Sequence, residues 1–169
     1  IKEEAVLWEQ ASGHANVLPI IEADEYEGQI LIVSEYAADG TLVDLLDKRG
    51  FLPVKKAVEI SVGILNGLEF LHSRQIIHRD IKPANILLQG EIPRLTDFGL
   101  SRVISSNSLS MSVSVNGTPY YMSPEAFNRK RNKQTDIWSF GVVLYKMLTG
   151  KMPFAGNDVG EIYASVFTR

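Results

Sequence analysis

Two long helical patterns flank a polar middle region, and their order constrains the fold more than any other feature of the sequence. The first pattern follows Pro53, a residue that favours the start of a helix. Its apolar and small side chains recur at helical spacing with polar residues opposite, which predicts a helix facing the core. These residues are Val54, Ala57, Val58, Ser61, Ile64, Leu65, Leu68 and Leu71. The second pattern, Asp136–Leu148, is dense in apolar residues and precedes Gly150, so we expect a central helix buried on all sides.

Short elements are predicted elsewhere in the chain. A helix is expected near residues 5–11, and Gly40-Thr41 would cap a short helix that reaches Asp47 before Gly50. A last helix is expected from Val159 to Phe167. Val17–Ile21 and Ile30–Val33 predict an antiparallel strand pair separated by an acidic stretch. The remaining strand-like pieces are Ile76–Ile77, Ile86–Leu88 and Arg94–Thr96, and a serine-rich loop is expected over 101–116.

Composition excludes several classes of protein. The chain of 169 residues is 45% hydrophobic, which suffices for one sizeable core. It has no cysteine, so a disulfide scaffold, a thiol nucleophile and a cysteine-based zinc site are excluded. A net charge of −3 gives no basic field for nucleic acid, and no apolar run reaches the ~20 residues that a membrane helix needs. We therefore expect a cytoplasmic domain that contacts neither nucleic acid nor membrane.

Short polar motifs lie between the two helical patterns, and each one alone has a structural explanation. An Asp beside an Arg is commonly a surface ion pair, and Asp and Gly favour turns whatever the function. The order of the motifs is far more specific than any single one. The series is His78-Arg79-Asp80-Ile81-Lys82-Pro83-Ala84-Asn85, Asp97-Phe98-Gly99, Gly117-Thr118-Pro119, Ser123-Pro124-Glu125 and Asp136-Ile137-Trp138-Ser139-Phe140-Gly141.

This series resembles the catalytic-loop, metal-binding and activation-segment motifs of eukaryotic-type (Hanks-type) protein kinases, and the resemblance covers essentially the whole chain. It implies an α+β, protein kinase-like fold: a partial small lobe over 1–35, a hinge over 36–40 and a mainly helical large lobe over 41–169. Lys82 and Thr118 look like the serine/threonine branch of the family. The stretch Ile92–Thr96 is similar to bacterial members.

The resemblance assigns the chemistry to a few polar residues. Phosphoryl transfer from ATP has a loose transition state, so catalysis is mostly positioning and charge neutralisation. By resemblance, Asp80 accepts or orients the proton of the attacking hydroxyl, Lys82 neutralises charge near the γ-phosphate, and Thr118 flanks the substrate. Asn85 and Asp97 would hold two Mg²⁺ ions, for which oxygen ligands are suited. The implied cofactors are ATP and Mg²⁺, and the implied partners are proteins with Ser or Thr hydroxyls.

The resemblance also implies a nucleotide site and a regulatory set. Backbone groups of Glu35 and Ala37 would bind adenine at the hinge, and Leu87 would pack below the ring. The residues that would continue this apolar column are Leu42, Val143 and Met147, which simple core packing explains equally well. Glu4 matches a glutamate that pairs with a strand lysine in the family. Ser114 falls at the position of the main phosphosite, where Arg79 and Arg102 would pair with the phosphate, although loop serines also serve solubility.

Parts of the family pattern do not occur in this sequence: the Gly-rich loop, the lysine partner of Glu4 and the late helices of the large lobe. We therefore expect negligible turnover from this segment alone, exposed apolar surface beside its strands, and activity when the native upstream sequence is included. The basic run over 129–133 is interpreted as a solvated turn, with docking of acidic partners as the alternative.

Two other classes of function stay open. One is a non-catalytic binding or scaffold module with a kinase-like lobe; the presence of Asp80, Lys82, Asn85 and Asp97 speaks against it. The other is a small-molecule kinase of related fold; Thr118 and the motif at 123–125 favour a protein substrate instead. The oligomeric state is left open.

Overall fold

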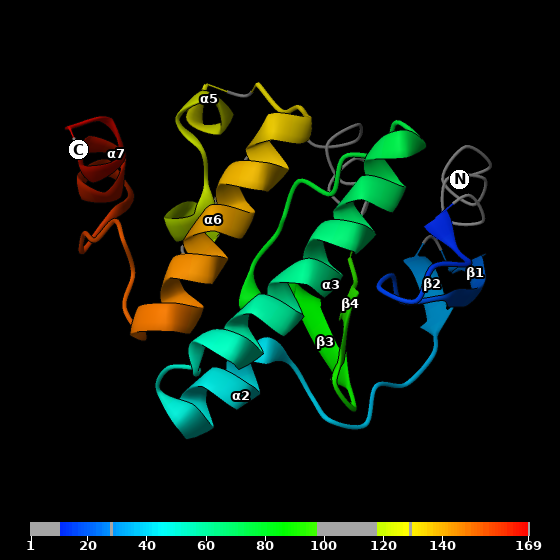
Figure 1. Cartoon of the computed structure of the whole chain (residues 1–169). Coiled ribbons are helices and arrows are strands. Elements are labelled where there is room, and N and C mark those ends of the chain that lie inside the picture. Colours follow the sequence, from blue (N-terminus) through cyan, green and yellow to red (C-terminus); the bar gives the residue numbers. More distant parts are fainter. Residues whose placement is uncertain (1–10, 28, 98–117, 129, 169) are drawn as a thin grey trace.

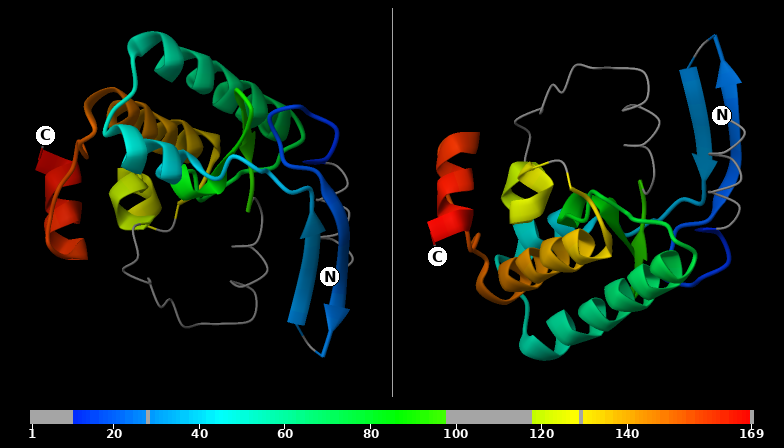
Figure 2. Two further views of the ribbon diagram at one scale, coloured as in Figure 1. Left: turned by 90° about the horizontal axis from the view of Figure 1, so that it is seen from below. Right: turned by 90° about the horizontal axis from the view of Figure 1, so that it is seen from above.

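A computed structural model of the chain describes residues 11–27, 29–97, 118–128 and 130–168, and Figure 1 shows their arrangement. In chain order the elements are β1 Ile20–Tyr26, β2 Gln29–Ser34, α2 Leu42–Arg49, α3 Val54–Ser73, the 3₁₀ turn η1 Pro83–Asn85, β3 Ile86–Gln89, β4 Ile92–Leu95, the 3₁₀ turn η2 Thr118–Tyr121, α5 Pro124–Phe127, α6 Lys133–Thr149 and α7 Val159–Thr168. The strands form two separate antiparallel pairs, β1 with β2 and β3 with β4. The β1–β2 pair lies at one end of the molecule and α7 at the other (Figure 2).

The core lies where α3, α6 and the β3–β4 pair meet. Helices α3 and α6 pack against each other, and β4 packs on α3. Fully buried aliphatic side chains from these elements form one cluster, which α2 extends. Its largest fully buried apolar members are Leu42, Ile60, Ile64, Leu68, Leu71, Ile81, Ile86, Leu95 and Met147. Because α3 and β3 both border this core, the segment that joins them begins and ends beside it.

The residues before β1 join this core instead of lengthening the strand. The Leu18 amide donates to the Leu95 carbonyl (2.8 Å), and the Leu95 amide donates to the Asn16 carbonyl (2.9 Å). Val17 and Leu18 are buried beside β4. The predicted antiparallel pair is confirmed, but its first strand was predicted too early, because β1 begins at Ile20 and runs through the acidic stretch.

The other strand predictions were accurate to different degrees. The β3–β4 pair confirms two of them, with β4 beginning two residues earlier than predicted. Residues 76–77 form no strand. The Ile76 amide instead donates to the Leu71 carbonyl (3.0 Å), which closes the end of α3. Gln75, at φ 61°, turns the chain at that point.

Helix α3 has the predicted length, and its buried face is the predicted one in part. Ile64, Leu68 and Leu71 are buried as predicted, whereas Val54 is 69% exposed. Val58 and Leu65 also lie at the surface. Glycine explains the difference, because a Cβ on Gly67 would lie 2.7 Å from the Asn16 carbonyl oxygen. A second glycine at position 63 makes the same close approach to Pro93. These contacts turn the glycine side of the helix inward.

The short helix and the long second helix have caps at both ends. Thr41 Oγ1 accepts from the Asp44 amide (3.3 Å) and Asp44 Oδ2 accepts from the Thr41 amide (2.7 Å), which confirms the predicted start of α2. Asn132 caps α6, so that helix begins three residues before the predicted Asp136. Gly150, at φ 69°, ends α6 as predicted.

Helix α6 is not buried on all sides, which corrects the prediction. Phe140, Val143 and Met147 face the core, whereas Ile137 and Tyr145 are exposed. Helix α7 agrees with its prediction to within one residue. Across the part of the chain that the structure describes, no helix combines the length and apolar character that crossing a bilayer requires.

Candidate active site

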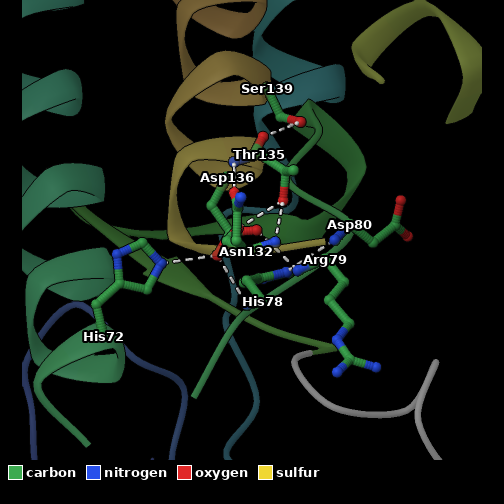
Figure 3. A network of polar contacts seen from close by, with 8 residues as sticks. All are labelled: His72, His78, Arg79, Asp80, Asn132, Thr135, Asp136 and Ser139. Atoms are coloured by element: carbon green, nitrogen blue, oxygen red, sulfur yellow. Dashed lines mark hydrogen bonds and ion pairs between the residues drawn. The ribbon is translucent and has the colours of Figure 1, made fainter. Parts of the chain in front are cut away.

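The loop that joins α3 to β3 carries three of the predicted catalytic residues, Asp80, Lys82 and Asn85, and a buried carboxylate holds its backbone. Asp136, in the first turn of α6, is 1% exposed. Its Oδ2 accepts from the His78 amide and its Oδ1 from the Arg79 amide, both at 2.8 Å. His72 Nε2, from the end of α3, lies 2.8 Å from the same Oδ2 (Figure 3). Three polar partners compensate the buried charge, and the N-terminus of α6 adds favourable dipoles.

Arg79 has a backbone conformation that few residues other than glycine adopt. Its φ is 72°, in the left-handed region, which costs energy in a residue with a Cβ. The bond from its amide to Asp136 offsets part of that cost. In Figure 3 the Arg79 side chain extends away from Asp136. The backbone of this residue thus faces α6, while the guanidinium extends in another direction.

His78, a residue of the same loop, is fully buried next to Asp136, which accepts a hydrogen bond from its amide. Burial lowers the pKa of His78 below its ordinary value, although Asp136, Asp80 and Asp97 act in the opposite direction. A neutral imidazole can accept a hydrogen bond, and the Asp80 amide donates to its Nδ1 at 3.4 Å. The ring therefore supports the peptide that precedes the Asp80 side chain.

Asp80, Lys82 and Asn85 converge in the second half of this loop, where Asp80 and Lys82 are partly exposed and Asn85 is buried. Lys82 Nζ lies 2.7 Å from Asp80 Oδ2. Asn85 Nδ2 donates to the same Oδ2 (2.9 Å) and to the Asp80 carbonyl (2.8 Å). Figure 3 shows the Asp80 carboxylate pointing away from Asp136. The turn η1 begins directly after Lys82, with Pro83 in its first position, and this tight turn brings the three side chains together.

The amide group of Asn85 is oriented for a second partner. Both of its side-chain donor bonds use Nδ2, so Oδ1 is the atom available to a cation. The Thr96 amide donates to the Asn85 carbonyl (3.1 Å), which brings the neighbouring Asp97 to the same place. Asp97 is exposed and has φ 61°. These two residues are the predicted metal ligands.

The donor set at Asn85 and Asp97 fits Mg²⁺. One amide oxygen and one carboxylate suit a hard cation that keeps waters and shares phosphate oxygens. Within the described ranges, no group of three or more His, Cys, Asp or Glu side chains could hold a metal by itself. The residues present therefore match a cation that arrives with a nucleotide.

Two of the predicted nucleotide residues, Glu35 and Ala37, lie in the segment that links β2 to α2, and Leu87 lies beside that segment on β3. The Glu35 amide donates to the Pro19 carbonyl (3.2 Å) and its Oε2 lies 3.2 Å from Arg94 Nη1 on β4. Ala37 is buried, and Leu87 on β3 is half-buried. Leu87 pairs with Thr41 just before α2, which brings β3 next to this segment. The predicted column residues Leu42, Val143 and Met147 are fully buried.

Helix α6 also holds the turn that contains Thr118. Thr118 begins η2, and Ser139 Oγ donates to the Tyr121 carbonyl at the end of that turn (2.7 Å). Burial raises the pKa of Tyr121 to about 12, so its hydroxyl stays protonated. Ser123 is fully buried and caps α5. One helix therefore anchors both the catalytic loop and the segment expected beside the substrate.

Three predicted regulatory residues, Glu4, Arg102 and Ser114, lie outside the described residues. Sequence analysis gave no role to Asp136 or His72, although both contribute to the site. A signal for Asp136 was present, because a carboxylate at the start of a strongly apolar helix needs partners when it is buried. The contact of Arg131 Nη1 with the Arg79 carbonyl (2.7 Å) was also missed, since the basic run was interpreted as a solvated turn.

A catalytic loop with Asp, Lys and Asn, followed by a β hairpin and a second Asp, defines the class of protein kinases. The protein kinase domain family matches residues 1–169, so the chain belongs to this family. It is 38% identical to human serine/threonine-protein kinase Nek5 over 170 residues, which cover 98% of the chain and 24% of Nek5. The α+β kinase fold and the serine/threonine branch predicted from the motifs are thereby confirmed.

Other relatives carry the same type of name. Identity is 35% with serine/threonine-protein kinase 36 of Pongo abelii, over 90% of the chain and 12% of that protein. Identity is 36% with the probable serine/threonine-protein kinase PknB of Lactococcus lactis, over 88% of the chain and 24% of that protein. The chain spans at most about a quarter of the length of these three relatives. Animal and bacterial proteins match about equally well, so the bacterial likeness of residues 92–96 stays a prediction.

Proposed function

We propose that the natural protein containing this chain is a serine/threonine kinase that transfers the γ-phosphoryl group of ATP to Ser or Thr hydroxyls of proteins. The observation that carries the proposal is the convergence of Lys82 Nζ and Asn85 Nδ2 on one carboxylate oxygen of Asp80, at 2.7 and 2.9 Å. Such a group of a carboxylate, a cation and an amide suits an alcohol that attacks a phosphate.

Each of these residues has a distinct part in the proposed reaction. Asp80 receives or orients the proton of the incoming hydroxyl. Lys82 provides positive charge where negative charge is transferred. Thr118, at the start of η2, lies beside the peptide that carries the hydroxyl. Helix α6 supports all three, because it holds both the catalytic loop and η2 through Asp136 and Ser139.

Asn85 and Asp97 would hold Mg²⁺, and the nucleotide would lie between them and the hinge. Mg²⁺ supplies charge neutralisation on the phosphates when it is bound. Asn85 contributes Oδ1 and Asp97 its carboxylate. At the hinge, 36–40, the Glu35 carbonyl and the Ala37 backbone would bind adenine, with Leu87 below it. We assign 1–35 to a partial small lobe and 41–169 to the large lobe.

Regulation by phosphorylation of Ser114 belongs to the same proposal, with Arg79 and Arg102 as phosphate partners and Glu4 aligning the nucleotide through a lysine. Mass spectrometry of the active protein should find phosphate at Ser114 or a close neighbour. Full activity of a Ser114→Ala variant would contradict the switch.

The test is transfer of labelled γ-phosphate by the natural full-length protein to a peptide array that contains Ser, Thr or Tyr. We expect Ser and Thr labelling that needs Mg²⁺ and falls about 10²- to 10⁴-fold in Asp80→Asn. The matched control is Asp47→Asn, at an exposed position of α2, which should keep full activity. Binding of Mg-ATP without any transfer would indicate a non-catalytic module instead, and transfer to small alcohols alone would indicate a small-molecule kinase.

A further inference from the structure

The peptide that precedes Asp80 is held by a residue that lies outside the catalytic loop. Arg131 lies two residues before α6, and its Nη1 donates to the Arg79 carbonyl at 2.7 Å. That carbonyl belongs to the peptide bond that joins Arg79 to Asp80. Its orientation sets the direction in which the Asp80 side chain leaves the backbone, so the contact acts one bond away from the proposed base.

Asp136 in α6 and Arg131 just before that helix thus bind both backbone polar groups of Arg79. Asp136 Oδ1 accepts from the Arg79 amide at 2.8 Å, and Arg131 donates to its carbonyl. Arg79 has φ 72°, a conformation that needs support from its surroundings. On its other side, the peptide that joins Arg79 to Asp80 has one further bond, the long one from the Asp80 amide to His78 Nδ1 (3.4 Å). The shorter bond from Arg131 to the Arg79 carbonyl (2.7 Å) restricts rotation about ψ more strongly.

The loop around Arg131 is fixed without the Arg131 side chain. The Lys130 amide donates to the Glu125 carbonyl (3.0 Å). Asn132 Oδ1 accepts from the Thr135 amide (3.1 Å), and Thr135 Oγ1 donates to the Asn132 carbonyl (2.6 Å). The loop therefore does not depend on the guanidinium for its conformation, and the Arg131 side chain is available to hold the catalytic loop.

We propose that Arg131 is a positioning residue for catalysis, which orients Asp80 through the Arg79–Asp80 peptide. The proposal rests on the kinase function proposed above. Arginine suits the role because its planar group donates in a fixed geometry and loses less freedom per hydrogen bond than lysine does. Part of the basic run over 129–133 thereby serves the active site and is not merely solvated.

The experiment compares Arg131→Met, Arg131→Lys and Lys130→Met in the natural full-length protein. Methionine keeps an apolar stem and removes the donor, and Lys130→Met removes the same charge from the neighbouring exposed residue. We expect kcat of Arg131→Met to fall about 10- to 100-fold, because small misplacements of reacting groups reduce rates by such factors. KM for ATP should stay within about twofold of wild type. Arg131→Lys should recover part of kcat, and Lys130→Met should match the wild type.

Hydrogen exchange separates positioning from folding. The Arg79 and Asp80 amides should exchange faster in Arg131→Met, while the amides of α3 and α6 keep their protection. Unchanged kcat in Arg131→Met, an equal loss in Lys130→Met, or failure of Arg131→Met to fold would each overturn the proposal. A wild-type protein without transfer removes the kinase function itself, whereas an active wild type with an equally active Arg131→Met removes this inference alone.

Discussion

The catalytic loop and the β1–β2 pair are both short segments beside the proposed nucleotide site, yet they are held in opposite ways. The loop is tied to the buried Asp136 by two backbone bonds and sits on the fully buried His78. The strand pair has its own ladder and packs Ile20 and Ile32 against the core, but it leaves Ile21 66% and Leu31 51% exposed. Exact placement of backbone near the chemistry thus comes from a polar anchor inside the helical core, because isolated two-stranded ribbons contribute little stability.

Helix α6 has two roles in this arrangement. Its apolar face supplies Val143 and Met147 to the core, while its first turn supplies Asp136 to the loop. A charge at such a site is tolerated only with complete partners. The stability of the large lobe and the geometry of the active site are therefore linked through one helix, and we expect substitutions in this helical core to have larger effects than substitutions in β1–β2.

The largest effect is expected from Asp136→Ala. The change leaves the His78 and Arg79 amides and the His72 ring without their acceptor, so the free energy of unfolding should fall by about 3–5 kcal/mol. Chemical denaturation measures it, with Asp47→Ala on the exposed side of α2 as control, expected within about 0.5 kcal/mol of wild type. Equal denaturation midpoints for Asp136→Ala and the control would show that Asp136 does not stabilise the fold.

One leucine of the helical core and one leucine of the β1–β2 pair should show the same contrast through packing. Leu68 on α3 is fully buried and Leu31 on β2 is half exposed. Leu68→Ala should lower the free energy of unfolding by about 2–5 kcal/mol, whereas Leu31→Ala should change it by about 0.5 kcal/mol or less. Denaturant titrations of both variants measure the difference. Similar losses would show that β1–β2 is as tightly integrated as the helical core.

Two helical glycines give a matched pair of smaller effects. A Cβ at Gly67 would lie 2.7 Å from the Asn16 carbonyl oxygen, whereas a Cβ at Gly141 meets nothing within 4 Å. Gly67→Ala should therefore destabilise the protein by about 1–3 kcal/mol through overpacking. Gly141→Ala should stabilise it by about 0.5–1 kcal/mol through helix propensity. Thermal melting of both variants measures the two changes in stability. A stabilised Gly67→Ala would contradict the close approach of α3 to Asn16.

This pair also marks the limit of what the sequence could predict. The helices were predictable because their signals are local, as with Thr41 before α2 and Gly150 after α6. The buried face of α3 was predicted only in part, because the inward position of Gly67 depends on a contact with Asn16 that no local pattern contains. The motifs predicted the proposed catalytic residues by type and order, and the fold brings Asp80, Lys82 and Asn85 together. The partner of His78, which is 58 residues away, emerges only from the fold.

At neutral pH the smallest expected effect comes from His78, and its pH dependence below 6.5 tests whether burial or the nearby acids dominate there. Burial lowers its pKa in the folded state, while the unfolded chain keeps the ordinary value near 6.5. Below that pH the unfolded state binds the extra proton, so stability should fall as pH drops, by up to about 1.4 kcal/mol per pH unit. Above it, His78 should contribute no pH dependence. Denaturant titrations between pH 5 and 8 measure the slope.

His78→Phe is the control, because it keeps a buried ring that cannot titrate, and its curve should be flatter than wild type below pH 6.5. If wild type instead gains stability on acidification relative to His78→Phe, then Asp136, Asp80 and Asp97 outweigh burial, and the loop is held by an imidazolium.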